Sequence, residues 1–157
     1  TLLKRFFDSS PLKGKIVFGQ QKSSELFFDR HLETYRMILE AHSEALDKEF
    51  FHELWSESGF KEKEKRLLSH LSGGDRQLLK VISLSCSQAD IYFFDEPGQS
   101  LDPEKKKFVS HVFAKLLQKK KTLLLVEHDC TWLPPGTIVR ELGVEKNELR
   151  EKKSWTI

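Results

Sequence analysis

The chain has 157 residues, of which 38% are hydrophobic, and its 26 basic and 24 acidic side chains give a formal net charge of +2. This length predicts one domain around a single core rather than two independent domains. The near balance of charge excludes a long-range field that would mark the whole molecule as a nucleic-acid binder. No apolar run approaches the roughly 18 residues that span a bilayer, so any membrane association would need a partner.

The cysteines indicate the cellular location of the protein, and the lysines bear on whether it binds nucleic acid. Cys86 and Cys130 are isolated thiols without metal-ligand spacing or a disulfide framework, which favours a reducing, cytoplasmic location over secretion. The lysine runs 105–107 and 119–121 flank a predicted helix. Lysines in such places usually form a solvated helix face, and this interpretation is favoured over a nucleic-acid patch.

The first half of the chain is predicted to be mainly helical. Residues 1–7 predict an interrupted helix, and residues 14–18 predict a short strand because β-branched and aromatic side chains dominate them. From about residue 29 to residue 58, apolar residues recur at three- and four-residue steps, the spacing of a helix. A small helical subdomain is therefore expected, with a core of Phe50, Phe51, Trp55 and Phe60. Stacking of a base on these aromatic residues is the weaker alternative.

The second half predicts a parallel sheet. Apolar residues within 78–84 predict a buried helix, and the runs 91–95 and 123–126 are typical of strands buried in such a sheet. Between these strands, Asp102 followed by Pro103 predicts the start of another helix, with Asp102 as its N-cap. Strand, crossover helix and strand in this order predict an α/β fold whose functional residues lie at the carboxyl ends of the strands.

A serine and two glycines lie at the entry to the helix predicted near residue 78. Glycines let a backbone approach an anion closely, a serine hydroxyl can donate a hydrogen bond, and the first-turn amides and helix dipole favour negative charge. Ser72, Gly73 and Gly74 therefore form a candidate phosphate-binding element. Taken alone, such a triplet is commonly just a loop and a helix cap.

Two adjacent carboxylates, Asp95 and Glu96, end the first predicted strand, and His128 follows the second. Beside a triphosphate, two acids would serve hydrolysis, because one can hold a metal ion and the other can act as a base towards the attacking water. The alternative is a buried strand that ends in an exposed acidic turn, followed by a histidine that is structural or solvent-exposed.

Three segments resemble, in order, the motifs of ATP-binding cassette (ABC) ATPases. Leu-Ser-Gly-Gly-Asp-Arg-Gln at 71–77 resembles the signature motif, Ile-Tyr-Phe-Phe-Asp-Glu-Pro at 91–97 the Walker B strand, and Glu-His-Asp at 127–129 the switch-histidine segment. The conjunction of these patterns identifies the chain as a member of the family over most of its length. The resemblance implies an α/β fold with a P-loop NTPase-like parallel sheet, flanking helices and an inserted α-helical signature subdomain.

The resemblance also implies roles for individual residues. Glu96 would polarise the attacking water, Asp95 would position Mg²⁺ through its water shell, and His128 would contact the γ-phosphate and hold the hydrolytic geometry. Signature residues would contact the ATP bound to the opposite subunit: Ser72, Gly73, Gly74 and Gln77.

A further motif follows the Walker B strand, and two positions of the chain depart from the family pattern. Ser100, Leu101 and Asp102 resemble the D-loop, which crosses the dimer interface; Asp102 is equally well explained as an N-cap, and the two roles can coexist. Gly98 replaces the usual small hydroxyl residue, and Leu78 stands where an arginine often follows the signature glutamine. Neither departure removes a catalytic group.

The start of the chain resembles the end of a P-loop. Thr1 and the three residues after it match those that follow Gly-Lys-Ser, where Thr1 would touch the α-phosphate. On this interpretation the chain begins inside the Walker A motif, lacks the glycine-rich loop and its lysine, and should be inactive alone. Gln20 or Gln21 resembles the Q-loop glutamine that senses Mg²⁺, although a pair of polar turn residues is a nearly equal alternative.

These implications combine into one partial domain: about 1–28 as the end of the P-loop helix, a strand and the Q-loop; about 29–74 as the helical subdomain; and about 75–157 as the rest of the core. The predicted function is the ATP-binding and ATP-hydrolysing subunit of an ABC transporter, with ATP and Mg²⁺ bound. Expected partners are a second nucleotide-binding domain, head to tail, and a transmembrane subunit at the inner face of a membrane, but no nucleic acid. The alternatives are a soluble ABC ATPase in translation or DNA maintenance, or a non-hydrolysing fragment.

Overall fold

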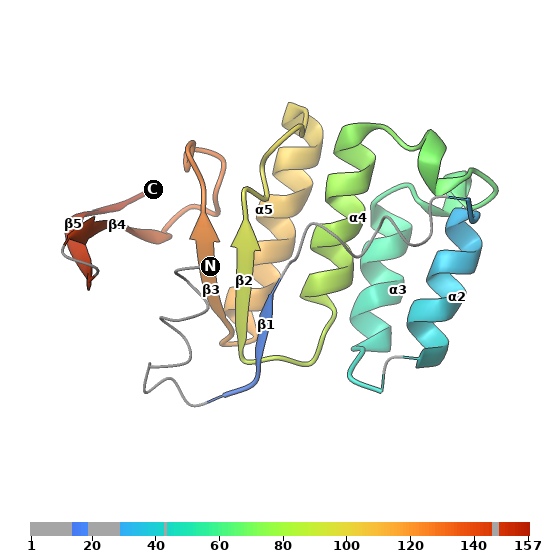
Figure 1. Ribbon diagram of the computed structural model, residues 1–157, viewed down its shortest axis with the longest axis horizontal. Coiled ribbons are helices and arrows are strands. Elements are labelled where there is room, and N and C mark those ends of the chain that lie inside the picture. Colours follow the sequence, from blue (N-terminus) through green and yellow to red (C-terminus); the bar gives the residue numbers. More distant parts are fainter. Residues whose placement is uncertain (1–13, 19–28, 43, 146–147) are drawn as a thin grey trace.

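The computed structural model of the protein describes residues 14–18, 29–42, 44–145 and 148–157 (Figure 1). The helix predicted at 1–7 lies outside these residues. In chain order, the elements are β1 (Ile16–Phe18), α2 (Leu32–His42), α3 (Lys48–Glu57), the 3₁₀ helices η2 (Lys61–Lys63) and η3 (Leu68–His70), α4 (Gly73–Ser85), β2 (Ile91–Asp95), α5 (Pro103–Gln118), β3 (Thr122–Val126), β4 (Ile138–Glu145) and β5 (Glu148–Thr156).

The strands β1, β2 and β3 form a parallel sheet in that order (Figure 1). Helix α5 is the crossover between β2 and β3, where Ile91 pairs with Thr122 and Asp95 with Val126. Because parallel strands all end at the same edge, this register brings the residues after Asp95 next to those after Val126. The predicted α/β fold with a parallel sheet is confirmed.

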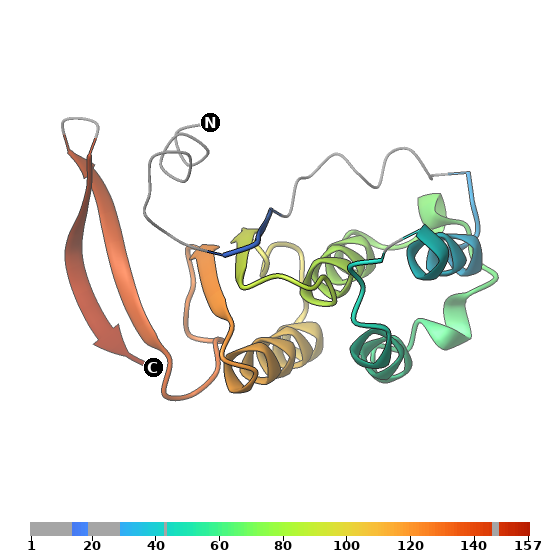
Figure 2. The ribbon, with the colours of Figure 1, turned by 90° about the horizontal axis from the view of Figure 1, so that it is seen from below.

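One part of the core lies between the sheet and the neighbouring helices α4 and α5, and the same cluster of buried residues continues into α3 (Figures 1 and 2). Phe94 of β2 packs on the fully buried Phe113 of α5, with 4.8 Å between the ring centroids. The predicted apolar face of α4 is buried at Leu78, Leu79, Val81 and Ile82, whereas Leu84 is only partly buried. These contacts hold the beginning of α4 close to the carboxyl end of β2.

The predicted helical subdomain is formed by α2, α3 and the 3₁₀ turns, at the opposite end of the molecule from β4 and β5 (Figure 1). The helical pattern of 29–58 falls into two helices, because the Asp47 side chain accepts a hydrogen bond from the Phe50 amide at 3.1 Å and caps a new helix there. All four predicted core aromatics are at most 4% exposed: Phe50, Phe51, Trp55 and Phe60.

The strands β4 and β5 form an antiparallel hairpin that extends from the rest of the molecule (Figures 1 and 2). The ends of the hairpin are joined by hydrogen bonds from the Gly136 amide to the Ile157 carbonyl at 2.7 Å and from the Ile157 amide to the Thr137 carbonyl at 3.1 Å. No secondary structure was predicted after residue 128, so this hairpin is visible only in the structure.

Lysines of the two runs, together with Lys115, form ion pairs with carboxylates of the same chain: Lys105 with Asp102, Lys106 with Asp129, Lys115 with Glu53, Lys119 with Asp47, and Lys121 with Asp90. Lys119 also lies over the ring of Phe50, 4.0 Å from its centroid. The lysines therefore tie α5 to α3 and to the loops around the sheet, whereas the sequence predicted only a solvated helix face.

Both cysteines are free thiols, as their isolation in the sequence predicts. Burial raises the pKa of Cys86 and that of the partly buried Cys130.

Within the ranges that the structure describes, no helix has the length and apolarity needed to cross a membrane.

Candidate functional site

The predicted motif residues meet where β2 and β3 end and α4 begins. The Gln77 side chain, on the second turn of α4, donates a hydrogen bond to the Glu96 carbonyl oxygen at 2.9 Å. The Glu96 amide donates to the Val126 carbonyl at 2.8 Å and so extends the β2–β3 ladder by one bond. A shallow hollow beside this end of β2 is lined by Gln77, Asp95, Pro97 and Gln99, among others.

Glu96 is held in a conformation that few non-glycine residues adopt. Its φ is 46°, in the left-handed region; this conformation costs of order 1–3 kcal/mol and persists only where the surrounding structure enforces it. Its carbonyl accepts hydrogen bonds from the Gln99 amide at 3.0 Å and from Gln77, and its carboxylate accepts one from the Gln99 side chain at 2.7 Å. The turn leaves the Glu96 side chain 35% exposed at the end of the sheet.

His128 lies beside Glu96, with 3.5 Å between Nε2 of the histidine and Oε1 of the glutamate. The imidazole is 90% exposed, so its other contacts are open to an incoming ligand. Sequence reasoning places these residues at the ends of two strands, and the register of β2 and β3 brings their side chains together.

Asp95 is the last residue of β2 and is exposed. No group of three or more His, Cys, Asp or Glu side chains that could hold a metal ion occurs in the described part of the chain. A single exposed carboxylate fits Mg²⁺ all the same, because Mg²⁺ usually keeps several waters and binds one or two carboxylates plus substrate phosphates. The residues present therefore suit a metal that arrives with a nucleotide.

The candidate phosphate-binding element begins α4. Ser72 is the N-cap, and its hydroxyl oxygen accepts a hydrogen bond from the Asp75 amide at 3.0 Å. Ser72 and Gly73 are exposed, whereas Gly74 is buried. A Cβ atom on Gly74 would lie 2.8 Å from the Ser100 carbonyl oxygen. Gly74 thus allows the segment after β2 to approach the helix start, a reason that differs from the close approach of an anion.

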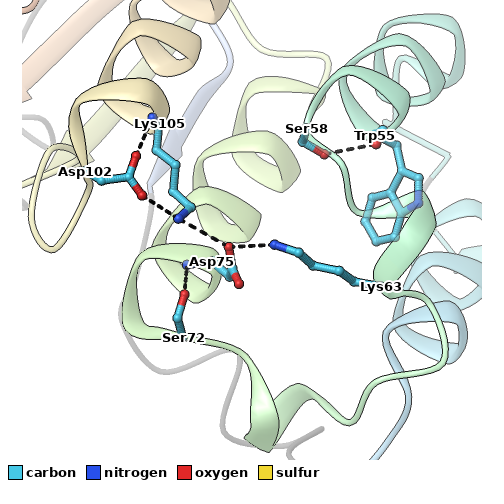
Figure 3. Close-up of polar contacts among 7 residues, drawn as sticks. All are labelled: Trp55, Ser58, Lys63, Ser72, Asp75, Asp102 and Lys105. Carbon is cyan, nitrogen blue, oxygen red and sulfur yellow. Dashed lines mark hydrogen bonds and ion pairs between the residues drawn. The ribbon is translucent and has the colours of Figure 1, made fainter.

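A polar network joins the helical subdomain, the start of α4 and the start of α5 (Figure 3). The Asp75 carboxylate, with a side chain 9% exposed, pairs with Lys63 at 3.1 Å and with Lys105 at 3.6 Å; Lys105 also pairs with Asp102 at 2.7 Å. Burial by itself would raise the pKa of Asp75, but the hydrogen bonds and positive charges around it, chiefly from Lys63, lower that pKa below its ordinary value.

Replacing Asp75 by asparagine is expected to lower the free energy of unfolding at neutral pH by about 1–3 kcal/mol, because two lysines lose their shared anion. The folded-state pKa of Asp75 lies below the unfolded value, so the carboxylate stabilises the fold above the unfolded pKa of about 4 and this contribution is lost as the pH falls through the folded pKa. Urea unfolding of the native chain and the Asp75→Asn variant should therefore differ at neutral pH and converge in acid.

The exposed Asp29 provides the control for this measurement. Asp29→Asn removes one charge without touching the network and should change the unfolding free energy little. A difference between native and Asp75→Asn proteins that is equally large in acid and at neutral pH would contradict the electrostatic explanation.

The other predicted positions are placed as follows. Asp102 caps α5 by accepting a hydrogen bond from the Lys105 amide at 2.9 Å, which confirms its N-cap interpretation. Leu78, where the family often has arginine, is 2% exposed and belongs to the core. Thr1, Gln20 and Gln21 lie outside the described residues.

Sequence reasoning missed four residues that shape this region: Lys63, Asp75, Glu127 and Trp132. Lys63 stands in a charged stretch that looks solvated, and Asp75 and Glu127 were noted only as members of the signature and switch-histidine segments, without contacts of their own. Their contacts join positions far apart in the sequence, such as the 29-residue separation between Gly98 and Glu127. No local pattern could have found these pairs.

No protein-family model matches the chain. It is 42% identical over 65 residues to the manganese transport system ATP-binding protein MntB of Bacillus subtilis, covering 41% of this chain and 26% of that protein. It is 31% identical over 162 residues to a Treponema denticola protein that carries the name ABC transporter ATP-binding protein, covering 91% of this chain and 32% of that protein. Translation initiation factor RLI1 of Saccharomyces cerevisiae is 39% identical over 84 residues, 51% of this chain and 14% of that factor.

The fold is also similar to solved structures. An archaeal ribosome recycling factor, aABCE1, in complex with ribosomal stalk protein aP1, has a TM-score of 0.67 at 22% identity over 90% of this chain and 27% of that one. A nucleotide-free ATP-binding cassette from an ABC transporter has a TM-score of 0.54 at 15% identity, over 74% of this chain and 52% of that one. At these identities the likeness shows the fold alone.

This chain spans about a third or less of the length of the curated relatives described above. The solved structures described above share its fold, and the segments of this chain that resemble the signature, Walker B and switch-histidine motifs meet at one end of its sheet. The sequence of the chain is thus similar to those of ABC transporter ATP-binding proteins, and its fold is that of ABC ATPase domains.

Proposed function

We propose that this chain takes part in ATP binding and hydrolysis as the ATP-binding subunit of an ABC transporter. The observation that carries the proposal is the meeting of Glu96 and His128, 3.5 Å apart, directly after the exposed Asp95. A base, a hydrogen-bonding imidazole and a hard oxygen ligand at one point are the groups that hydrolysis of a Mg²⁺-bound nucleotide requires.

In this proposal, each of the three side chains has a separate task. Glu96 orients and polarises the water that attacks the γ-phosphorus, and the left-handed turn holds its carboxylate towards that water. His128 contacts the γ-phosphate across the open side of its ring. Asp95 holds Mg²⁺ through coordinated water, and the metal supplies neutralisation of the phosphate oxygens when it is bound.

The start of α4 is proposed to bind the nucleotide of a second ATP-binding domain. Its capping serine and first glycine are exposed, and free amides at a helix N-terminus attract phosphate oxygens. Gln77 is proposed to contribute to the same contact, with its side chain held in place by the hydrogen bond that it donates to the Glu96 carbonyl. Asp102 at the start of α5 is proposed to lie near the same interface, and Thr1 and Gln20 or Gln21 are proposed to serve ATP and Mg²⁺ as the family resemblance implies.

Transport is favoured over translation because the Treponema denticola relative, which aligns with 91% of this chain, is named as an ABC transporter ATP-binding protein. The proposed partner is then a transmembrane subunit, which would keep the chain at the cytoplasmic face of a membrane. A soluble role in translation is the second candidate, supported by the likeness to RLI1 and to the ribosome recycling factor. Copurification with a membrane subunit supports transport, whereas copurification with ribosomes supports the second candidate.

The signature role can be tested with the N-cap of α4. The test calls for an extended form of the chain, in which the glycine-rich phosphate loop of an ABC ATPase is added before Thr1. Ser72→Asp keeps a good N-cap but places a negative charge where the partner's γ-phosphate is proposed to lie. Sedimentation velocity with ATP and Mg²⁺ should show dimerisation of the extended form, weakened at least about tenfold by Ser72→Asp.

Ser72→Asn is the matched control, because asparagine caps as well as aspartate but carries no charge. It should dimerise more strongly than the aspartate variant. Equal ATP-dependent dimerisation of both variants would contradict phosphate binding at the start of α4.

A further inference from the structure

The Glu127 carboxylate bridges the two segments that carry Glu96 and His128. One oxygen, Oε2, accepts a hydrogen bond from the Gly98 amide at 2.9 Å, and the other, Oε1, accepts one from the His128 amide at 3.0 Å. Gly98 lies two residues after Glu96, and Glu127 is partly buried. A single side chain is thus bonded to the backbone on both sides of the candidate site.

The bridge begins where the sheet ends. The last pairing between β2 and β3 joins Asp95 to Val126, and the Glu96 amide makes one further bond to the Val126 carbonyl. Beyond that bond, the turn after Glu96 and the segment after Val126 are connected by the Glu127 side chain through Gly98. The carboxylate therefore continues the tie between the two strands past the end of their ladder.

Close packing leaves the bridge little freedom. A Cβ atom on Gly98 would lie 2.7 Å from Oε2 of Glu127 and 2.9 Å from the Trp132 ring. The Trp132 ring is itself packed against the buried Phe113 of α5, with 5.9 Å between centroids. The absence of a side chain at Gly98 thus lets the carboxylate and the indole close over the turn, which explains in physical terms why glycine suits this position.

The chemistry of the bridge also specifies the residue. An ionised carboxylate has acceptors on both oxygens and can serve two amide donors at once. A glutamine of the same shape has one acceptor and one donor group, so one of the two backbone amides would face another donor. An exchange of glutamate for glutamine should therefore break one side of the bridge while preserving its volume.

We infer that Glu127 is a positioning residue that fixes the Glu96 turn relative to His128 through its bonds to the Gly98 and His128 amides. The consequence for catalysis rests on the proposed ATPase function, whereas the structural tie does not. Glu127 acts through the backbone and touches neither the water nor the phosphate in this scheme.

The structural tie is tested by amide hydrogen exchange, measured by NMR on the whole chain without nucleotide. The Gly98 amide should exchange slowly in the native protein although it lies outside every helix and strand. In Glu127→Gln, at least one of the Gly98 and His128 amides should exchange about tenfold faster or more. Glu49→Gln, at an exposed position in the first turn of α3, removes the same charge elsewhere and should leave both amides unchanged.

The catalytic consequence is tested in the extended form by steady-state kinetics. Glu127→Gln should lower kcat about tenfold with little change in the KM for ATP, because binding groups stay in place while the reacting groups lose their relative position. Unchanged exchange of both amides, or fast exchange of Gly98 already in the native chain, would overturn the inference. So would accelerated exchange with full kcat. Failure of the proposed function is a separate result, seen as normal hydrolysis by Glu96→Gln.

Discussion

Replacing Glu96 by glutamine is expected to lower kcat for ATP hydrolysis in the extended form by at least about a hundredfold, while ATP binding is retained. A positioned general base contributes about 10²–10⁴ in rate, and glutamine cannot take a proton from the attacking water. The substitution keeps the volume of the side chain and leaves the two hydrogen bonds to the Glu96 carbonyl untouched. Phosphate release and nucleotide affinity, measured on the same preparation, separate catalysis from binding.

The comparison needs a control variant that loses one carboxylate near the candidate site but outside it. Glu104 is exposed in the first turn of α5, and Glu104→Gln should hydrolyse ATP at nearly the native rate. Nucleotide should also accumulate in a stable dimer of the Glu96→Gln form, because the dimer no longer turns over. Native turnover by Glu96→Gln would remove Glu96 from the mechanism and with it the proposed site.

Replacing Gly74 by alanine is expected to destabilise the fold by about 1–3 kcal/mol, the usual cost of forcing extra volume into a packed region. The added Cβ would lie 2.8 Å from the Ser100 carbonyl oxygen and 3.5 Å from Cδ of Lys105. The lysine end could move aside, but the carbonyl belongs to the backbone and to a residue with a φ of 62°. Urea unfolding monitored by circular dichroism gives the change in unfolding free energy.

The adjacent glycine makes a matched control for this substitution. A Cβ on Gly73 would meet its nearest atom, Cβ of Ser100, at the ordinary contact distance of 3.8 Å. Because alanine has a higher helix propensity than glycine, Gly73→Ala should leave the unfolding free energy unchanged or raise it slightly. If both variants unfolded like the native protein, the close approach between the start of α4 and the segment after β2 would not exist in solution.

Much of the fold could be predicted from local patterns. The apolar runs at β2 and β3 predicted two buried strands, and the helix between them starts with an N-cap and a proline. Strand β2 is buried, whereas β3 is only partly buried and its last residue, Val126, is 38% exposed. Aromatic residues at helical spacing predicted the core of the subdomain, which is buried. The hairpin of β4 and β5 was not assigned, and its eight- and nine-residue strands pair with a register irregularity between Glu141 and Leu142.

The sequence predicted the candidate catalytic residues of the site but not the contacts that hold them in place. Asp95, Glu96 and His128 were found because carboxylates and histidine directly follow apolar strands. The contact of Gln77 with a nucleotide stays a prediction, and the hydrogen bond from its side chain to the Glu96 carbonyl was not foreseen. The roles of all these residues in binding and hydrolysis stay predictions until the variants described above are measured.

The sequence by itself determined which chemical groups the chain carries and where the strands and helices that carry them end, because both depend on residue identity and local spacing. Only the tertiary structure decided which groups support one another: Gln77 with Glu96, Gly98 with Glu127, and Asp75 with two lysines. The first two contacts join residues separated by 19 and 29 positions, and they arise when α4 and β3 pack beside β2. Hydrogen bonds and close packing at such separations depend on distances in space, which no pattern along the chain encodes.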